Sequence, residues 1–169
     1  MQNKCDKYSL YLVKMSDMAV LHQKEYRTIN LVGLLGGVDL ITDKIGSAFD
    51  LITLSNKGIK KASLDALAGH MGMTKKDFAE DILNLSVKTL ERKKSDDLLD
   101  RQTSSHVIEV AKVVEHAFDV FENEEKVQKW LSTPNRALNQ MKPLDLFYMP
   151  TGLGMVDNVL GRIEEGVYS

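Results

Sequence analysis

Six side chains between residues 86 and 94 have the chemistry to bind phosphate groups. They are two hydroxyls and four cations: Ser86, Lys88, Thr89, Arg92, Lys93 and Lys94. Only one acid, Glu91, lies among them. Lysine and arginine contact phosphate oxygens, and hydroxyls near the start of a helix can reach phosphate or base edges in DNA. The segment is therefore a candidate DNA-binding surface, although a basic helix face can also be merely solvated.

The C-terminal end of the chain carries a second group of polar side chains. Arg162, Glu164, Tyr168 and the carboxylate of Ser169 offer a cation, anions and an aromatic ring on a short end. Gly166 predicts the stop of the last helix, because glycine takes the left-handed conformation there without a Cβ penalty. The tail that follows either projects to contact a partner or lets Tyr168 pack back on the helix.

Catalytic and metal-binding patterns are missing from the sequence. The four histidines, His22, His70, His106 and His116, are scattered, and no HExxH or CxxC motif accompanies them. No nucleophile-elbow motif supports a catalytic triad. We expect His116 to face solvent or to be hydrogen-bonded locally. The chain is not expected to be an enzyme or to hold a metal or cofactor.

Three short helices must position the basic segment. Serine and threonine cap helix N-termini, and the expected caps are Ser63, Thr74 with Asp77 as its box partner, and Ser86. Gly72 is expected to end the first helix, and Asn84 to make the turn before the third. The third helix is expected to run through VKTLERKK. The spacing predicts a helix-turn-helix.

A longer helix is expected to follow and to tie the two halves together. Val107, Val110, Ala111, Val114 and Ala117 fall on one face, with Phe118 and Phe121, and acids and Lys112 fall on the other. Thr103 or Ser104 is its expected cap. Burying one such valine or phenylalanine stabilises the fold by roughly 1.5 to 3 kcal/mol.

All three prolines lie in the last 46 residues. Because proline suits the first turn of a helix, Pro134 and Pro143 predict the starts of two short helices. After Gly152, the spacing of Val156, Val159, Leu160 and Ile163 predicts one amphipathic helix.

Composition bounds the class of protein. The chain has 169 residues, 43% hydrophobic and 27% charged, and its net charge is −2. The middle, residues 57–105, carries ten basic and eight acidic groups, whereas residues 106–169 carry six and ten. No apolar run is long enough to span a membrane, and the start is a poor secretory signal. The single cysteine, Cys5, excludes an internal disulfide and is consistent with a cytoplasmic protein.

The C-terminal stretch resembles the toxin-binding domain of the Xre/MbcA/ParS-type antitoxins. The residues that carry the resemblance are Trp130 and Leu131, Pro134 and Asn135, Ala137 and Leu138, Pro143 to Leu146, Gly152, Val156, Leu160, Arg162 and Ile163, and Gly166 to Ser169. Residues 34–95 are similar to the helix-turn-helix region of Xre antitoxins. Lysine stands in two places where the family has arginine, which favours phosphate contact over bidentate guanine reading.

The resemblance implies an all-α fold, an Xre-like helix-turn-helix domain followed by a small helical toxin-binding domain. The expected regions are an N-terminal arm, 1–30, a helix-turn-helix region, 31–105, and a toxin-binding domain, 106–169. It implies a type II antitoxin that neutralises a RES-domain, NAD-consuming toxin by blocking its active site with the C-terminal end. The implied toxin-binding residues are Asn135, Gly152, Arg162, Glu164, Gly166, Val167, Tyr168 and Ser169.

Further partners are implied by the same resemblance. They are operator DNA, which would be bound to repress the chain's own operon, and a second copy of the chain within a toxin-antitoxin hetero-oligomer. Two other functions stay open from the residues. One is a stand-alone helix-turn-helix transcriptional regulator, and the other is an interaction module that does not bind DNA.

Overall fold

The structure, a computed structural model, describes residues 31–167. The described part contains helices, turns and two isolated β-bridges, Lys60 with Leu98 and Asn135 with Met141. The expected all-α fold is confirmed for these residues. The predictions made for the N-terminal arm, residues 1–30, and for Tyr168 and Ser169 fall outside them.

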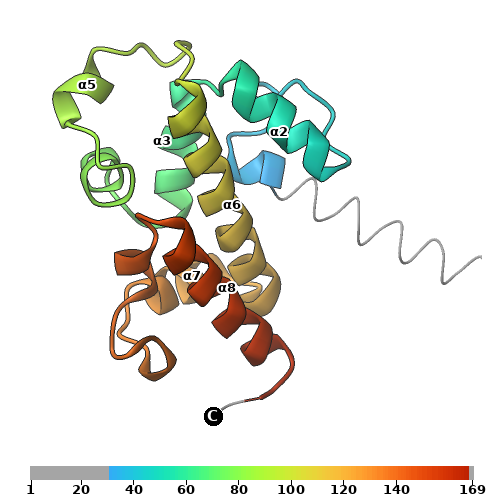
Figure 1. Ribbon diagram of the computed structural model, residues 1–169, viewed down its shortest axis with the longest axis vertical. Helices are drawn as coiled ribbons and strands as arrows, with labels where there is room; N and C mark the ends of the chain where they lie inside the picture. The colour runs from blue at the N-terminus through green and yellow to red at the C-terminus, as the bar shows by residue number, and fades with distance from the viewer. Residues whose placement is uncertain (1–30, 168–169) are drawn as a thin grey trace, which may run out of the picture.

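Most helices after α2 follow one another with short connections, and a longer loop, residues 92–100, joins α5 to α6 (Figure 1). Residues 31–34 are helical. The elements after them are α2 (Ala48–Lys57), α3 (Lys61–His70), α4 (Lys75–Asp77), the π-helical turn η1 (Phe78–Ile82), α5 (Val87–Glu91), α6 (Arg101–Phe121), α7 (Glu124–Leu131), the 3-10 turns η2 (Arg136–Leu138) and η3 (Pro143–Leu146), and α8 (Pro150–Glu164).

The longest helix, α6, runs through the middle of the molecule and packs against α2, α7 and α8. The five expected positions from Val107 to Ala117 are buried, whereas Phe118 and Phe121, which were expected on the same face, are half-buried against the core. Ile108 and Val113 are buried as well, because α2 covers one flank of α6 and α8 covers the other. The buried stripe is therefore wider than the sequence pattern indicated.

One buried cluster of apolar side chains extends from Leu31 to Leu160. The predicted boundary between residues 105 and 106 falls inside the continuous helix α6. The helix-turn-helix region and the C-terminal region therefore share a single core, to which α6 contributes on both sides.

The N-terminus of α6 corrects one prediction. Its cap is Asp100, whose Oδ1 accepts the Thr103 N–H at 2.9 Å, while the Thr103 hydroxyl donates to Asp100 Oδ2 at 2.6 Å. Thr103 and Ser104 lie within the helix and are buried. The Ser104 hydroxyl accepts the N–H of Ile59 at 3.1 Å, so it joins α6 to the start of α3.

Ser63 does not cap α3, contrary to prediction. The N-cap is Lys60, and Ser63 is buried within the helix. The N–H of Lys61 donates to the Asp97 carbonyl at 2.9 Å, and the N–H of Ala62 donates to the Ser95 carbonyl at 3.0 Å. Backbone carbonyls from a distant segment thus satisfy the first turn, and no side-chain cap is required there.

Two proline predictions have different outcomes. Pro143 is the first residue of η3, as expected. Pro134 does not start a helix, because Asn135 follows it in an extended conformation and caps η2. The Asn135 side chain accepts the N–H of Ala137 at 2.8 Å, which holds that turn.

Candidate functional site

The basic segment lies on the helix-turn-helix unit formed by α3, α4 with η1, and α5. Thr74 caps α4 by accepting the N–H of Asp77 at 3.1 Å, and Ser86 caps α5 by accepting the N–H of Thr89 at 3.3 Å, as predicted. Gly72 ends α3 with a φ of 69°. Asn84 makes the turn with a φ of 52°, a conformation that asparagine tolerates better than most residues.

The hydroxyls of this unit also bind one another. Ser86 Oγ and Thr89 Oγ1 lie 2.8 Å apart at the exposed start of α5. One hydroxyl uses its proton in this contact, so the pair has one remaining proton and open lone pairs for a ligand. The sequence predicted both hydroxyls at the helix start but not their mutual hydrogen bond.

The predicted cations are split between a helix and the turn after it. The helix α5 ends at Glu91, so it is shorter than expected, and only Lys88 lies within it. Three of the cations are exposed: Lys88, Arg92 and Lys94. Lys93 is half-buried, and its Nζ donates to the Leu98 carbonyl at 3.1 Å. The ammonium group of Lys93 is therefore already used in a contact within the fold.

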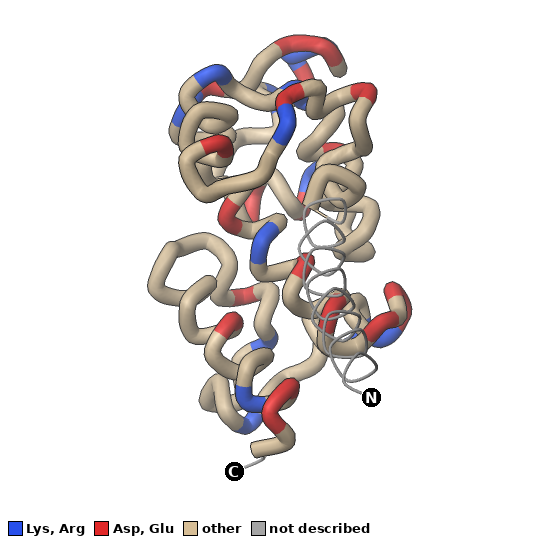
Figure 2. Tube along the Cα trace, turned by 90° about the vertical axis from the view of Figure 1, so that its right-hand side faces the viewer, with Lys and Arg blue, Asp and Glu red and all other residues tan. Residues whose placement is uncertain are grey.

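The segment that follows these cations carries two acids, Asp96 and Asp97. Lys60 Nζ is 3.1 Å from Asp96 Oδ1, and the Lys94 backbone N–H donates to Asp97 Oδ2 at 2.7 Å. Figure 2 shows Lys, Arg, Asp and Glu residues intermixed at this end of the molecule. Acidic and basic residues are thus mixed around the basic segment.

Two residues predicted to bind a partner hold the C-terminal fold together. Asn135 caps η2, and its N–H donates to the Met141 carbonyl at 3.0 Å. Gly152 is buried in α8, where a Cβ would overlap the carbonyl of Leu146. Glycine at this position lets α8 approach the end of η3. Binding of a partner by either residue stays a prediction.

The end of α8 presents the other described residues of the predicted tail. Gly166 has a φ of 70° and donates its N–H to the Ile163 carbonyl at 3.1 Å, while Val167 donates to Arg162 at 2.9 Å. These two bonds form a Schellman cap, as the sequence predicted for Gly166. Arg162, Glu164 and Val167 are exposed around it. The helix stop and the exposed side chains thus lie together.

A histidine joins this last helix to the centre of the molecule. His116 Nδ1 in α6 lies 2.7 Å from Asp157 Oδ1 in α8, and His116 Nε2 lies 3.5 Å from Glu164 Oε2. The imidazole is only 16% exposed. The expectation of a solvent-facing or locally bonded histidine was wrong, because its partners lie on a helix more than 40 residues away in sequence.

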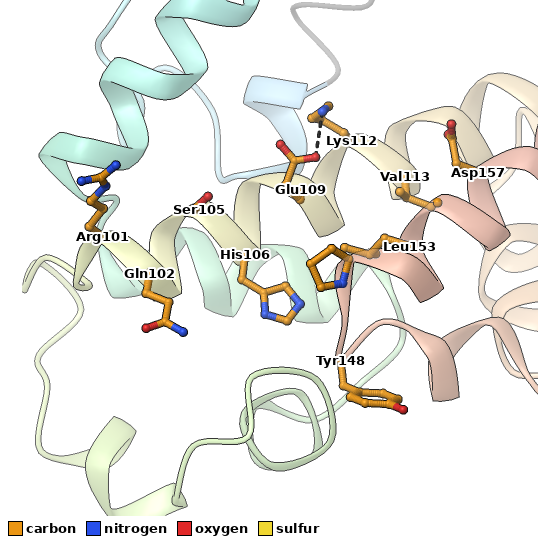
Figure 3. Close-up of a pocket in the computed structure, with 12 residues that line it drawn as sticks. Arg101, Gln102, Ser105, His106, Glu109, Lys112, Val113, Tyr148, Leu153 and Asp157 are labelled. Carbon is orange, nitrogen blue, oxygen red and sulfur yellow. Dashed lines mark hydrogen bonds and ion pairs between the residues drawn. The ribbon is translucent and has the colours of Figure 1, made fainter.

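A cleft of about 780 Å³ lies between the first half of α6 and the start of α8 (Figure 3). Arg101, His106, Tyr148 and Leu153 are among its lining residues. The Nε2–H of His106 donates to the Phe147 carbonyl at 2.8 Å, which fixes the histidine tautomer. Lys112 pairs with Glu109 at 2.8 Å. This cleft was not predicted from the sequence, because its walls come from segments that are far apart along the chain.

Neither metal chemistry nor a membrane span is indicated within residues 31–167. No group of three or more histidine, cysteine, aspartate or glutamate side chains gathers there in a way that could hold a metal ion. None of the helices in this range is long and apolar enough to cross a bilayer.

Comparison with known proteins divides the chain in two. Residues 50–112 match the antitoxin Xre-like helix-turn-helix domain, and residues 116–166 match the antitoxin Xre/MbcA/ParS C-terminal toxin-binding domain. The chain is also 31% identical over 67 residues to a protein named Antitoxin Xre from Photorhabdus laumondii. That match covers 39% of this chain and 45% of the relative, so it spans less than half of the relative's length.

Proposed function

The chain belongs to the Xre/MbcA/ParS-type antitoxin family, and from this we propose that it binds and neutralises a cognate toxin protein through its C-terminal domain. The observation that carries the proposal is the match of residues 116–166 to a toxin-binding domain whose last helix ends at an exposed cap. The role is that of a non-enzymatic regulator acting in the cytoplasm.

The proposed toxin is a RES-domain enzyme that consumes NAD, and the proposed mechanism is occlusion of its active site. The support lies in the end of α8, where Gly166 stops the helix and leaves Val167 52% exposed. Arg162 and Glu164 flank this end with opposite charges. A nucleotide pocket binds charged groups and an aromatic base, so a short end with one cation, several anions and Tyr168 has complementary chemistry.

The second proposed activity is binding of operator DNA, by which the chain represses its own operon. Its support is the match of residues 50–112 to a helix-turn-helix domain and the exposure of Lys88, Arg92 and Lys94. In a helix-turn-helix the second helix of the motif enters the major groove, and neighbouring cations contact phosphates. In this chain α5 would be that helix. The proposal includes a homodimer within the toxin-antitoxin complex. A dimer with two-fold symmetry binds an operator whose two half-sites are related by the same symmetry.

A binding experiment tests the first proposal. The chain is co-expressed with the product of the adjacent reading frame, and the amount of that product retained during purification is measured. We expect Arg162→Glu to reduce retention, because it reverses an exposed charge beside the helix stop. The matched control is Lys44→Glu, an equally drastic reversal at an exposed loop position outside the matched domains.

The outcomes separate the alternatives. Retention by the wild type with loss in Arg162→Glu supports the toxin-binding role. Failure of the wild type to retain the neighbouring product, together with operator binding, would favour the stand-alone transcriptional regulator. Retention of the product without salt-dependent DNA binding would favour the interaction module.

A further inference from the structure

The outward face of α2 lacks the charges that usually cover an exposed helix. Phe49 is 78% exposed and Ile52 is 54% exposed, and the exposed Thr53 and Asn56 complete the same face at helical spacing. Leu54 and Ser55, on the opposite side, are buried against the rest of the molecule. Solvent-facing helix surfaces are normally charged or polar, so a neutral face with an exposed phenylalanine is typical of an interaction surface.

Other helices of the described structure carry charges on their outward faces. In α6 the exposed positions include Glu109 and Lys112, which pair with each other. In α7 the exposed positions include Glu124, Glu125 and Lys126. The neutral face of α2 is therefore a property of this helix rather than of the whole surface.

The two charged residues of α2 have opposite signs and lie at opposite ends. Asp50 lies in the first turn and Lys57 in the last, seven residues or two turns apart, so both project from the same flank of the helix. Asp50 accepts hydrogen bonds from the Gly46 N–H at 3.0 Å and from the Ser47 hydroxyl at 2.9 Å. Lys57 Nζ lies 2.8 Å from Asp43 in an exposed pair, which leaves the ammonium further donors.

This arrangement is self-complementary in one orientation only. Two copies of α2 can pair antiparallel about a two-fold axis perpendicular to the helices. The flank that carries Asp50 and Lys57 then lies on the same side of the pair in both copies. Asp50 of each copy then meets Lys57 of the other. In a parallel pair the two-fold axis runs along the helices and places the same flank of the two copies on opposite sides, so Asp50 and Lys57 of one copy would not meet those of the other.

We propose that the outward face of α2, made of Phe49, Ile52, Thr53 and Asn56, binds the same face of a second copy of this chain in an antiparallel, two-fold arrangement. The proposal rests on the proposed homodimer and names its surface. It is independent of the toxin, because α2 lies outside residues 116–166. An isologous contact of this kind closes after two copies, so it produces dimers and not filaments.

Sedimentation velocity on the full chain tests the surface. We expect the wild type to sediment as a dimer and Phe49→Glu to raise the dissociation constant of the dimer at least tenfold. Because Phe49 is 78% exposed, the substitution should leave the circular dichroism melt unchanged. The matched control, Met155→Glu, alters an apolar side chain of α8 that is 46% exposed and should remain dimeric. A monomeric wild type, or a Phe49→Glu variant that dimerises as well as the wild type, would overturn the proposal.

A charge-reversal pair tests the orientation. Asp50→Lys and Lys57→Glu each create two repulsive contacts in an antiparallel homodimer, so each variant alone should dimerise weakly. An equimolar mixture of the two should recover dimers, because every 50–57 contact between unlike copies then joins opposite charges. Local damage from the lost Gly46 and Ser47 contacts would not be rescued by mixing. Absence of recovery would contradict the antiparallel pairing.

Failure here is distinguishable from failure of toxin binding. Lys57→Glu should retain the neighbouring gene product as the wild type does, whereas Arg162→Glu should dimerise as the wild type does. If α2 is covered instead by residues 1–30 of the same chain, the wild type will be monomeric, which counts against the proposal.

Discussion

At the scale of single residues, Asp100 contributes to the stability of α6 through its carboxylate. The pKa of Asp100 is held below its usual value by hydrogen bonds from the Thr103 hydroxyl and the Thr103 N–H. A carboxyl whose pKa is lower in the folded state stabilises the fold above its unfolded pKa. This contribution is lost as the pH falls through the folded pKa, so it is present at neutral pH and disappears in acid.

We therefore expect Asp100→Ala to lower the free energy of unfolding by about 1 kcal/mol at pH 7, the usual value of a helix cap. The difference between variant and wild type should shrink as the pH is lowered below about 4, near the ordinary pKa of an aspartate. Urea unfolding across this pH range measures it. An equal difference at pH 7 and pH 3 would contradict the role of the ionised carboxylate.

Gly152 and Gly154 provide a contrast within one helix. A Cβ at Gly152 would overlap the Leu146 carbonyl, whereas a Cβ at Gly154 meets nothing within 4 Å. We expect Gly152→Ala to destabilise the protein by about 1 to 3 kcal/mol, as overpacking does. Gly154→Ala should be neutral or stabilise it by up to about 1 kcal/mol. Equal melting temperatures for the two variants would contradict the close approach of α8 and η3.

Residues with local hydrogen-bonding roles were predicted best from the sequence. Thr74, Ser86, Asn84 and Gly166 act through neighbours within a few positions, so their roles are visible in short segments. The expected caps at Ser63 and at Thr103 or Ser104 were wrong for different reasons. Distant backbone carbonyls satisfy the start of α3, and an aspartate just before the expected position caps α6.

At the scale of elements, the cations that follow α5 should contribute to DNA affinity without supporting the fold. Arg92 is exposed, whereas Lys93 bonds the Leu98 carbonyl. We expect Arg92→Gln to weaken operator binding and to reduce the slope of log K against log salt by about 0.9, the value of one phosphate contact. Fluorescence anisotropy at several salt concentrations measures it.

The control for this prediction is Lys112→Gln on α6. Lys112 is paired with Glu109 and belongs to a different element, so its loss should leave the salt slope unchanged. Equal slopes for the wild type and Arg92→Gln would show that the cation makes no phosphate contact.

The helices themselves were predicted more reliably than their packing. The apolar spacing of residues 107–121 and 156–163 identified α6 and α8, because burial repeats with the period of the helix. The spacing does not state which helix covers which face. The contact of His116 with Asp157 and the cleft beside His106 arise from that pairing, and neither was predicted.

At the scale of the whole molecule, one core joins two surfaces with different proposed partners. The unit that carries α5 lies at one end of the molecule and the last turn of α8 at the other (Figure 1). Because α6 contributes buried side chains to both halves, neither half has a separate core among the described residues. The two proposed partners, a toxin and operator DNA, would therefore bind at opposite ends of the molecule.

The central claim is that the C-terminal end neutralises the toxin, and truncation after Gly166 tests it most directly. NAD consumption by the cognate toxin is measured against increasing amounts of the full chain and of the chain lacking Val167 to Ser169. Truncation removes the bond from the Val167 N–H to the Arg162 carbonyl and keeps the bond from the Gly166 N–H to the Ile163 carbonyl, so only the end of α8 should loosen and the truncated chain should melt close to the full chain. We predict that the truncated chain inhibits at least tenfold less effectively. Undiminished inhibition by a folded truncated chain would contradict the account.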